Sequence, residues 1–349
     1  MSVAFTNVVK RYGSVIAVSG ISFTVQAGTL VTLLGPSGCG KTTTLRMIAG
    51  LELPSEGRVE IAGRDVSTLP ATQRDVSMVF QSYALFPHMS VLENVAYGLR
   101  RSGLARKDAT RMANAGLAQV GLENYGQRQP SELSGGQQQR VAVARALVLK
   151  PSVLLFDEPL SNLDARLRRQ MREEIRELQQ RLGLTVVYVT HDQQEAMAVS
   201  DRIIVMNAGR IEQQGVPRDL YERPATPFLA RFMGESNPAR GHVRRLDPQR
   251  VRVQLGHAQI DIENTTALDG EATVAVRPEA IVVERVPGPT DALTGTVARA
   301  SYLGTHMEYS IDTEAGALFA TCPRVDRPLA SGDKVALILA PRGVIVVES

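Results

Sequence analysis

The chain has no long apolar run, and this absence excludes one class of protein. No uninterrupted apolar stretch in its 349 residues approaches the roughly 18 to 20 residues that a membrane-spanning helix needs. The first residues, Met1 to Phe5, also lack the basic and apolar regions of a secretory signal. The sequence therefore predicts a protein that is made in the cytosol and stays there.

The chain also has few cysteines and a small net charge. Cys39 and Cys322 are the two cysteines, and the formal net charge is +3. A disulfide would tie up the glycine-rich segment around Cys39, so we expect reduced thiols. We interpret Cys39 as a small side chain between two glycines rather than as a redox sensor. The small charge gives no electrostatic argument for a nucleic-acid partner.

One glycine-rich segment follows the apolar run Leu30 to Leu34 and matches the pattern G-x-x-x-x-G-K-[ST]. A strand, a glycine turn and a helix in this order are typical of a phosphate-binding loop, whose backbone N–H groups point at phosphate oxygens. Lys41 would reach the β- and γ-phosphates, and Thr42 would offer its hydroxyl to Mg²⁺. The predicted nucleotide-binding residues here are Gly35, Pro36, Ser37, Gly38, Cys39, Gly40, Lys41, Thr42 and Thr43.

A second segment, Leu133 to Arg140, predicts another anion site. Ser134 can cap a helix that continues to Val148 and is stopped by Pro151. Its hydroxyl, the amides of Gly135 and Gly136 and the helix N-terminus would together attract phosphate without a lysine. One chain thus carries two separate phosphate-recognising ends.

Polar side chains follow three predicted strands of an open α/β sheet, at the edge where ligands bind. Gln81 follows the first strand, the pair Asp157 and Glu158 follows the second, and His191 follows the third. Two adjacent carboxylates favour a nearby cation, so we expect Asp157 to bind Mg²⁺ and Glu158 to polarise a water. Gln81 would coordinate Mg²⁺ or orient a water, and His191 would donate to the γ-phosphate or the attacking water.

In this order the residues resemble the ATP-binding subunit of ATP-binding-cassette (ABC) transporters over positions 1 to about 235. The matching motifs are the aromatic Tyr12, the Walker A segment Gly35 to Thr43, Gln81, the signature Leu133 to Gln137, the Walker B segment Val153 to Asp157, the acid Glu158, the D-loop Ser161 to Asp164 and the switch His191. The resemblance implies that ATP is also contacted by Tyr12, Gln137 and Asp164. It implies a catalytic set of Glu158, His191, Gln81 and Lys41, and a metal set of Thr42, Gln81 and Asp157.

The resemblance also explains why two phosphate sites occur in one chain. It implies a head-to-tail dimer in which the Ser134 helix tip of one copy completes the Lys41 pocket of the other around ATP. The further partners it implies are two integral membrane permease subunits and, indirectly, a periplasmic or surface solute-binding protein. The chain would then lie peripherally on the cytoplasmic face of the inner membrane.

Beyond residue 235 the pattern changes. We interpret Glu235 to Pro238 as a linker and the short alternating runs after it as strands of a small barrel. Few aromatic residues and many interspersed acids argue against nucleic-acid binding by this barrel. The predicted fold is therefore an α/β P-loop cassette, with a mixed sheet and a helical subdomain, at residues 1–235. A small all-β, oligonucleotide-binding-like domain would follow at residues 236–349.

The blocks Val276 to Glu279 and Tyr302 to Tyr309 resemble the accessory (TOBE-type) domain of bacterial importer ATPases. Such an ATPase does not touch the cargo, so its own residues cannot identify the solute. The resemblance alone indicates it, and it favours ferric iron. Spermidine or putrescine, phosphonate and sugar are the alternatives. A soluble cassette ATPase acting on ribosomes or DNA is an alternative class, and a simple P-loop kinase is a third.

Overall fold

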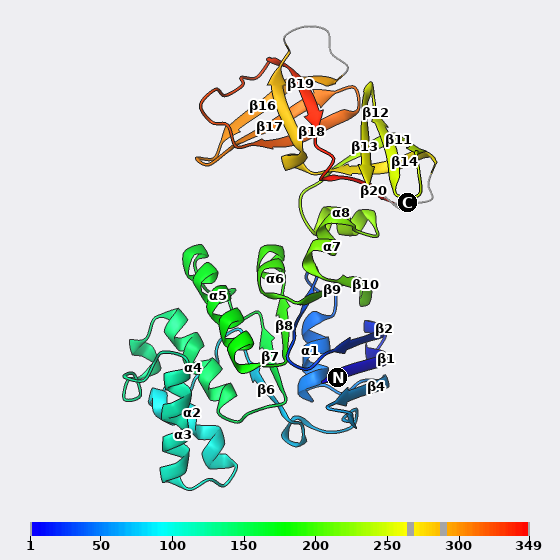
Figure 1. Cartoon of the computed structure of the whole chain (residues 1–349). Coiled ribbons are helices and arrows are strands. Elements are labelled where there is room, and N and C mark those ends of the chain that lie inside the picture. The colour runs from blue at the N-terminus through cyan, green and yellow to red at the C-terminus, as the bar shows by residue number, and fades with distance from the viewer. Residues whose placement is uncertain (1, 264–268, 287–291, 348–349) are drawn as a thin grey trace. The chain divides into compact units, whose positions relative to one another are not determined.

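The computed structural model describes residues 2–263, 269–286 and 292–347 (Figure 1). Contacts divide the chain into two compact units, Met1–Pro217 and Arg218–Ser349. Across the described residues, no helix combines the length and apolar character needed to span a membrane.

The first unit is built on a six-stranded sheet with the order β10-β9-β3-β8-β7-β6. Its strands are β3 (Leu30–Leu34), β6 (Val76–Val79), β7 (Val153–Asp157), β8 (Val186–Thr190), β9 (Arg202–Asn207) and β10 (Arg210–Gly215). All neighbouring strands are parallel except β9 and β10. Every residue of β3 and β8 is buried, which is why these strands are continuous apolar runs rather than alternating ones. The predicted mixed sheet is confirmed.

A second sheet of this unit is antiparallel, with the order β2-β1-β4-β5. It contains β1 (Val3–Tyr12), β2 (Val15–Val25), β4 (Glu56–Ile61) and β5 (Arg64–Asp65). Phe5 and Phe23, on paired strands, stack with their ring centroids 4.6 Å apart. Their side chains share one core with α1 (Lys41–Ala49), so this sheet holds the helix that carries the glycine-rich segment.

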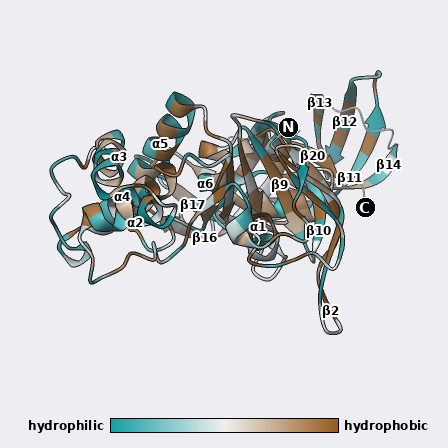
Figure 2. Cartoon of the chain, turned by 90° about the horizontal axis from the view of Figure 1, so that it is seen from below, coloured by the Kyte–Doolittle hydropathy of each residue, from teal (hydrophilic) through white to brown (hydrophobic). Residues whose placement is uncertain are grey.

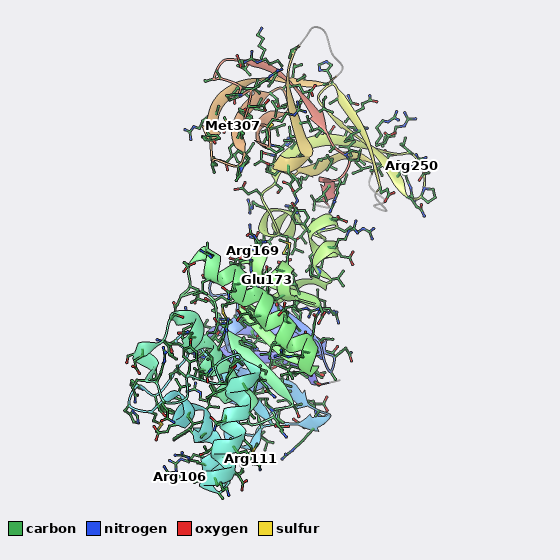
Figure 3. The ribbon with its side chains drawn as sticks, turned by 60° about the vertical axis from the view of Figure 1, so that its left-hand side comes forward. Arg106, Arg111, Arg169, Glu173, Arg250 and Met307 are labelled. Atoms are coloured by element: carbon green, nitrogen blue, oxygen red, sulfur yellow. The ribbon has the colours of Figure 1, made fainter. Side chains whose placement is uncertain are left out.

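Three helices of the first unit form the predicted helical subdomain (Figure 1). They are α2 (Val91–Arg101), α3 (Arg106–Gln119) and α4 (Gly135–Leu147). Figure 2 shows both teal and brown residues on them, as expected for helices with one exposed face. The longer α5 (Ala165–Leu182) exposes a charged face, on which Arg169 and Glu173 lie one turn apart (Figure 3). The helix α6 (Gln193–Val199) follows β8.

The second unit contains two five-stranded antiparallel sheets, β13-β12-β11-β14-β20 and β15-β19-β16-β17-β18. Their strands are β11 (Asn237–Arg245), β12 (Arg250–Leu255), β13 (Ala258–Glu263), β14 (Gly270–Val276), β15 (Ile281–Arg285), β16 (Leu293–Tyr302), β17 (Met307–Thr313), β18 (Gly316–Cys322), β19 (Lys334–Leu339) and β20 (Val344–Val347). Both sheets contribute side chains to one hydrophobic core. The all-β domain expected after residue 235 is confirmed, since the described residues beyond it form these strands and no α-helix.

The division at Pro217 lies earlier than residue 235, where the sequence placed the domain boundary. The reason is that α7 (Pro217–Glu222) and α8 (Pro227–Phe232) belong with the second unit. Tyr221 and Glu222 of α7 bond to Glu279 and Arg342, and α8 contacts β14 and β20. Ala230 of α8 shares a small core with Ala275, Ile345 and Val347. That the cassette proper extends to residue 235 stays a prediction.

The linker expected at Glu235 to Pro238 is wrong in its second half. Asn237 and Pro238 begin β11, where they pair with Val276 and Ala275 of β14. The other edge of β11 pairs with β12 only from His242 onward. A proline is tolerated at this end because one side of the strand has no ladder to interrupt. The Asn237 amide donates to the carbonyls of Val276 and Phe319, so the segment is anchored rather than free.

Among the residues that the structure describes, Arg277 is the largest fully buried side chain, with 0% exposure. Its Nη1 donates to the carbonyls of Ala230 and Gly234, and its Nη2 donates to that of Tyr221. The Arg277 Cζ also lies 4.2 Å from the centroid of the Tyr221 ring.

We expect Arg277→Met to lower the free energy of unfolding of this unit by about 3 kcal/mol or more, because several carbonyls lose their donor. Arg342→Met is the control, since the exposed Arg342 pairs with Glu222 at the surface and should contribute about 1 kcal/mol at most. Thermal unfolding of the two variants measures both losses of stability. If Arg277→Met lost as little stability as Arg342→Met, the role of Arg277 would be contradicted.

Candidate functional site

The glycine-rich segment joins the carboxyl end of β3 to the start of α1. Lys41 opens the helix and is only 5% exposed. Its ammonium donates to the carbonyls of Gly35 at 2.7 Å and Pro36 at 2.9 Å, so the side chain crosses the mouth of the loop. The strand, turn and helix predicted from the sequence are therefore all present.

Two glycines of this loop have no room for a side chain. A Cβ atom on Gly35 would lie 2.2 Å from the Met206 carbonyl oxygen, and one on Gly40 would lie 2.6 Å from that of Ala17. Gly40 also has a φ of 102°, which L side chains rarely adopt. The loop is thus seated against its own unit, which fixes where its backbone N–H groups point.

Cys39 is a buried free thiol inside the loop, and its Sγ lies 3.8 Å from the Lys41 ammonium. Burial raises the pKa of the thiol, and the neighbouring lysine only partly opposes this. A protonated, buried thiol is a poor nucleophile. This supports the interpretation of Cys39 as a small packing residue. Cys322 is also free, as expected for reduced cysteines.

Asp157 ends β7 beside the loop. The Thr42 hydroxyl donates to its carboxylate at 3.5 Å, so two oxygen groups suited to Mg²⁺ lie side by side. Burial raises the pKa of Asp157, the Arg46 charge opposes this, and the Glu158 carboxylate adds to it. A cation held here would relieve the cost of the half-buried carboxylate.

Glu158 follows directly and has a left-handed backbone with a φ of 46°. Its N–H donates to the Val189 carbonyl at 3.0 Å, and its carboxylate lies 3.2 Å from Nδ1 of His191. Non-glycine residues in this conformation are uncommon and cluster at functional sites. The structure therefore brings together the two side chains that the sequence placed at the ends of different strands.

Gln81 lies exposed just beyond β6, at the same edge of the sheet. Its backbone carbonyl accepts a hydrogen bond from the Asn162 side chain at 3.0 Å. Asn162 holds the D-loop against Gln81, and the sequence analysis did not assign it this role. Its partner is a backbone carbonyl, which every residue has, so no residue pattern could have identified the contact.

Ser134 is the exposed N-cap of α4, as predicted. Its hydroxyl accepts from the N–H of Gln137, whose side chain in turn accepts from the Ser134 N–H. A Cβ atom on Gly135 would lie 3.1 Å from a Leu163 methyl, and one on Gly136 would lie 3.1 Å from a Leu167 methyl. The signature glycines thus allow the helix tip to rest against the D-loop side of the same chain.

Asp164 and Tyr12 lie at the margins of the site. The Asp164 carboxylate caps α5 by accepting from the Leu167 N–H at 2.9 Å. Tyr12 ends β1 with 45% of its surface exposed, and the Lys10 ammonium lies 4.8 Å from its ring centroid. An aromatic face so exposed is available for stacking on a purine.

Two groups of predicted residues are not joined within one chain. At one end, Lys41 bonds to the Gly35 carbonyl and Thr42 bonds to Asp157. At the other end, Ser134 bonds to Gln137, and no hydrogen bond between described residues joins these two sets. The described residues also contain no cluster of three acidic, histidine or cysteine side chains that could hold a metal alone. A phosphate-bound Mg²⁺ needs only one or two protein ligands, so the donor set fits that ion.

Comparisons with known proteins agree with this geometry. The model of the ABC transporter family matches residues 18–161, and that of the TOBE domain matches residues 274–347. The chain is 57% identical over 347 residues to "Fe(3+) ions import ATP-binding protein FbpC 1" of Rhizobium meliloti (strain 1021), covering 99% of this chain and 98% of that protein. It is 56% identical, with the same coverage, to the FbpC protein of Brucella abortus (strain 2308).

A solved structure is also similar. It is the dimeric, post-hydrolysis state of the ATP-binding cassette MJ0796 bound to ADP and Pi, with a TM-score of 0.55 and 33% sequence identity. The match covers 62% of this chain and 99% of that one. The similarity therefore extends over an ATP-binding cassette that is seen there as a dimer.

Proposed function

The chain belongs to the ABC transporter family, and from this premise we propose that it is the ATP-hydrolysing subunit of an importer of ferric iron. The observation that carries the proposal is identity of 55 to 57% with Fe(3+) import ATP-binding proteins along almost the whole chain. That span includes the TOBE domain of the second unit, which a match to the cassette alone would not cover. The chain is an ATPase, and ferric iron is the solute that the names of these relatives give.

We propose that the two phosphate-recognising ends act on one nucleotide from different copies of the chain. Lys41 of one copy would bind the β- and γ-phosphates while the Ser134 helix tip of the other closes over them. This follows from the separation of the two ends within one chain, and the dimeric state of the similar cassette supports it. ATP then holds the dimer together, and hydrolysis loosens it.

Glu158 and His191 would perform the chemistry at that interface. The left-handed backbone of Glu158 turns its carboxylate toward the imidazole, so the two can share one water between them. Glu158 would polarise the attacking water, and His191 would contact the γ-phosphate or the same water. Catalysis of phosphoryl transfer consists mainly of such positioning and charge stabilisation.

Mg²⁺ would be held by Thr42 and Asp157, with Gln81 within reach at the neighbouring strand end. When bound, the ion supplies positive charge against the β- and γ-phosphates. The half-buried Asp157 carboxylate beside a threonine hydroxyl supports this assignment.

Two permease subunits and a solute-binding protein are the remaining proposed partners, with the chain peripheral on the cytoplasmic face of the inner membrane. The segment after Gln81 would contact the permeases, and no nucleic-acid partner is proposed.

Deletion of the gene tests the solute. Uptake of radioactive ferric iron under iron limitation should fall to background and return with the wild-type gene, but not with Lys41→Ala. Spermidine uptake, measured in parallel, should not change. Unchanged iron uptake together with lost spermidine uptake would contradict the ferric-iron proposal while leaving the ATPase assignment intact.

A further inference from the structure

The segment between β6 and α2, residues 81–88, is apolar for a loop and is held by two helices of the helical subdomain. We call it the connector segment. Asn94 of α2 is fully buried and binds one end of it: its Oδ1 accepts from the Phe86 N–H at 2.8 Å, and its Nδ2 donates to the Phe86 carbonyl at 3.1 Å. The turn at Tyr83 and Ala84 is held by Arg145, which lies on α4, two turns beyond the signature.

Arg145 forks across two consecutive carbonyls of the connector segment. Its Nη1 donates to the Ala84 oxygen at 2.6 Å, and its Nη2 donates to the Tyr83 oxygen at 2.8 Å. The guanidinium also lies 5.8 Å from the centroid of the Phe86 ring. A planar fork of this kind fixes both distance and orientation, which a lysine ammonium would not.

The two residues that Arg145 binds have an unfavourable backbone. Tyr83 has a φ of 60° and Ala84 a φ of 48°, and neither is a glycine. Consecutive left-handed residues persist only where the surroundings hold them. Two charge-assisted hydrogen bonds from one side chain help to hold this conformation.

We propose that Arg145 is a positioning residue that ties the connector segment to the signature helix, so that the two move as one body. One end of α4 carries Ser134, which the proposed function places against the partner's ATP. The connector segment begins at Gln81, beside the nucleotide of its own chain. The tie would transmit closure of the dimer from the signature tip to the surface that contacts the permeases, so this inference rests on the proposed function.

The tie itself can be tested on the isolated protein by hydrogen exchange. The Tyr83 N–H donates to the Phe80 carbonyl, and its exchange reports whether the left-handed turn stays closed. Arg145→Met should speed this exchange roughly tenfold or more, since two charge-assisted bonds are lost. The Phe86 N–H, held by Asn94, should change less, and Arg145→Lys should give an intermediate effect. The control is Arg181→Met, which removes a similar bond from α5 to the Gln119 carbonyl and should leave Tyr83 unchanged.

Coupling is tested in the assembled transporter. Ferric-loaded binding protein should stimulate the wild-type and Arg181→Met ATPases, whereas in Arg145→Met the ratio of stimulated to basal rate should fall toward one. Slow Tyr83 exchange in Arg145→Met, or full stimulation despite fast exchange, would overturn the proposal. If the wild-type complex is not stimulated at all, the proposed importer function fails, and the exchange experiment still decides whether Arg145 holds the turn.

Discussion

Glu158→Gln is expected to lower ATP hydrolysis by at least about a hundredfold, the usual effect of removing a general base. Glutamine keeps the length of the side chain and an oxygen that can face His191, but it cannot take a proton from water. Lys41, Thr42 and Asp157 are unchanged, so ATP should still bind. Because hydrolysis is what loosens the dimer, the variant should accumulate as an ATP-bound dimer.

The measurements are phosphate release and the mass of the protein in solution with and without ATP and Mg²⁺. Glu173→Gln is the matched control, since Glu173 is 65% exposed on α5 and its ion pair within the described part of the chain is with the exposed Arg169. It should hydrolyse ATP at the wild-type rate. Like the wild type, it should not accumulate as an ATP-bound dimer, because hydrolysis loosens the dimer. Wild-type turnover in Glu158→Gln would refute the assignment of Glu158.

Local patterns in the sequence were sufficient to place the predicted site residues in the fold, while their roles stay predictions. The phosphate loop is a contiguous motif, and buried parallel strands are apolar runs whose ends deliver Asp157, Glu158 and His191 to one edge. The N-cap at Ser134 is likewise visible as a serine followed three residues later by glutamine. These features depend on residues close together in the chain.

Contacts to backbone carbonyls could not be predicted in this way. Asn162 binds the carbonyl of Gln81, and Arg145 binds two carbonyls more than 60 positions away. The partner in such a contact carries no sequence signal. The linker error at Asn237 has a related cause, because a proline ordinarily interrupts a strand and only the one-sided pairing of β11 makes it acceptable there.

Ser134→Arg should abolish hydrolysis in a homodimer, because a large cation at the tip of α4 opposes the helix dipole and fills the space of the γ-phosphate. Lys41→Ala should abolish it as well. A mixture of the two variants distinguishes a shared site from one enclosed in a single copy. If each site takes Lys41 from one copy and Ser134 from the other, every mixed dimer has one intact site and one with both defects.

Activity should therefore return on mixing. Half of randomly formed dimers are mixed and each has one of two sites, which gives about a quarter of wild-type activity if the sites act independently. If each copy enclosed its own ATP, both sites of a mixed dimer would carry one defect, and mixing would restore nothing. Ser90→Arg is the control for the loss of a helix cap as the cause of inactivity. Ser90 caps α2 with the same reciprocal hydrogen bonds, made there with Glu93. That variant should lose about 1 kcal/mol of stability and retain ATP hydrolysis, because the tip of α2 is not a phosphate site.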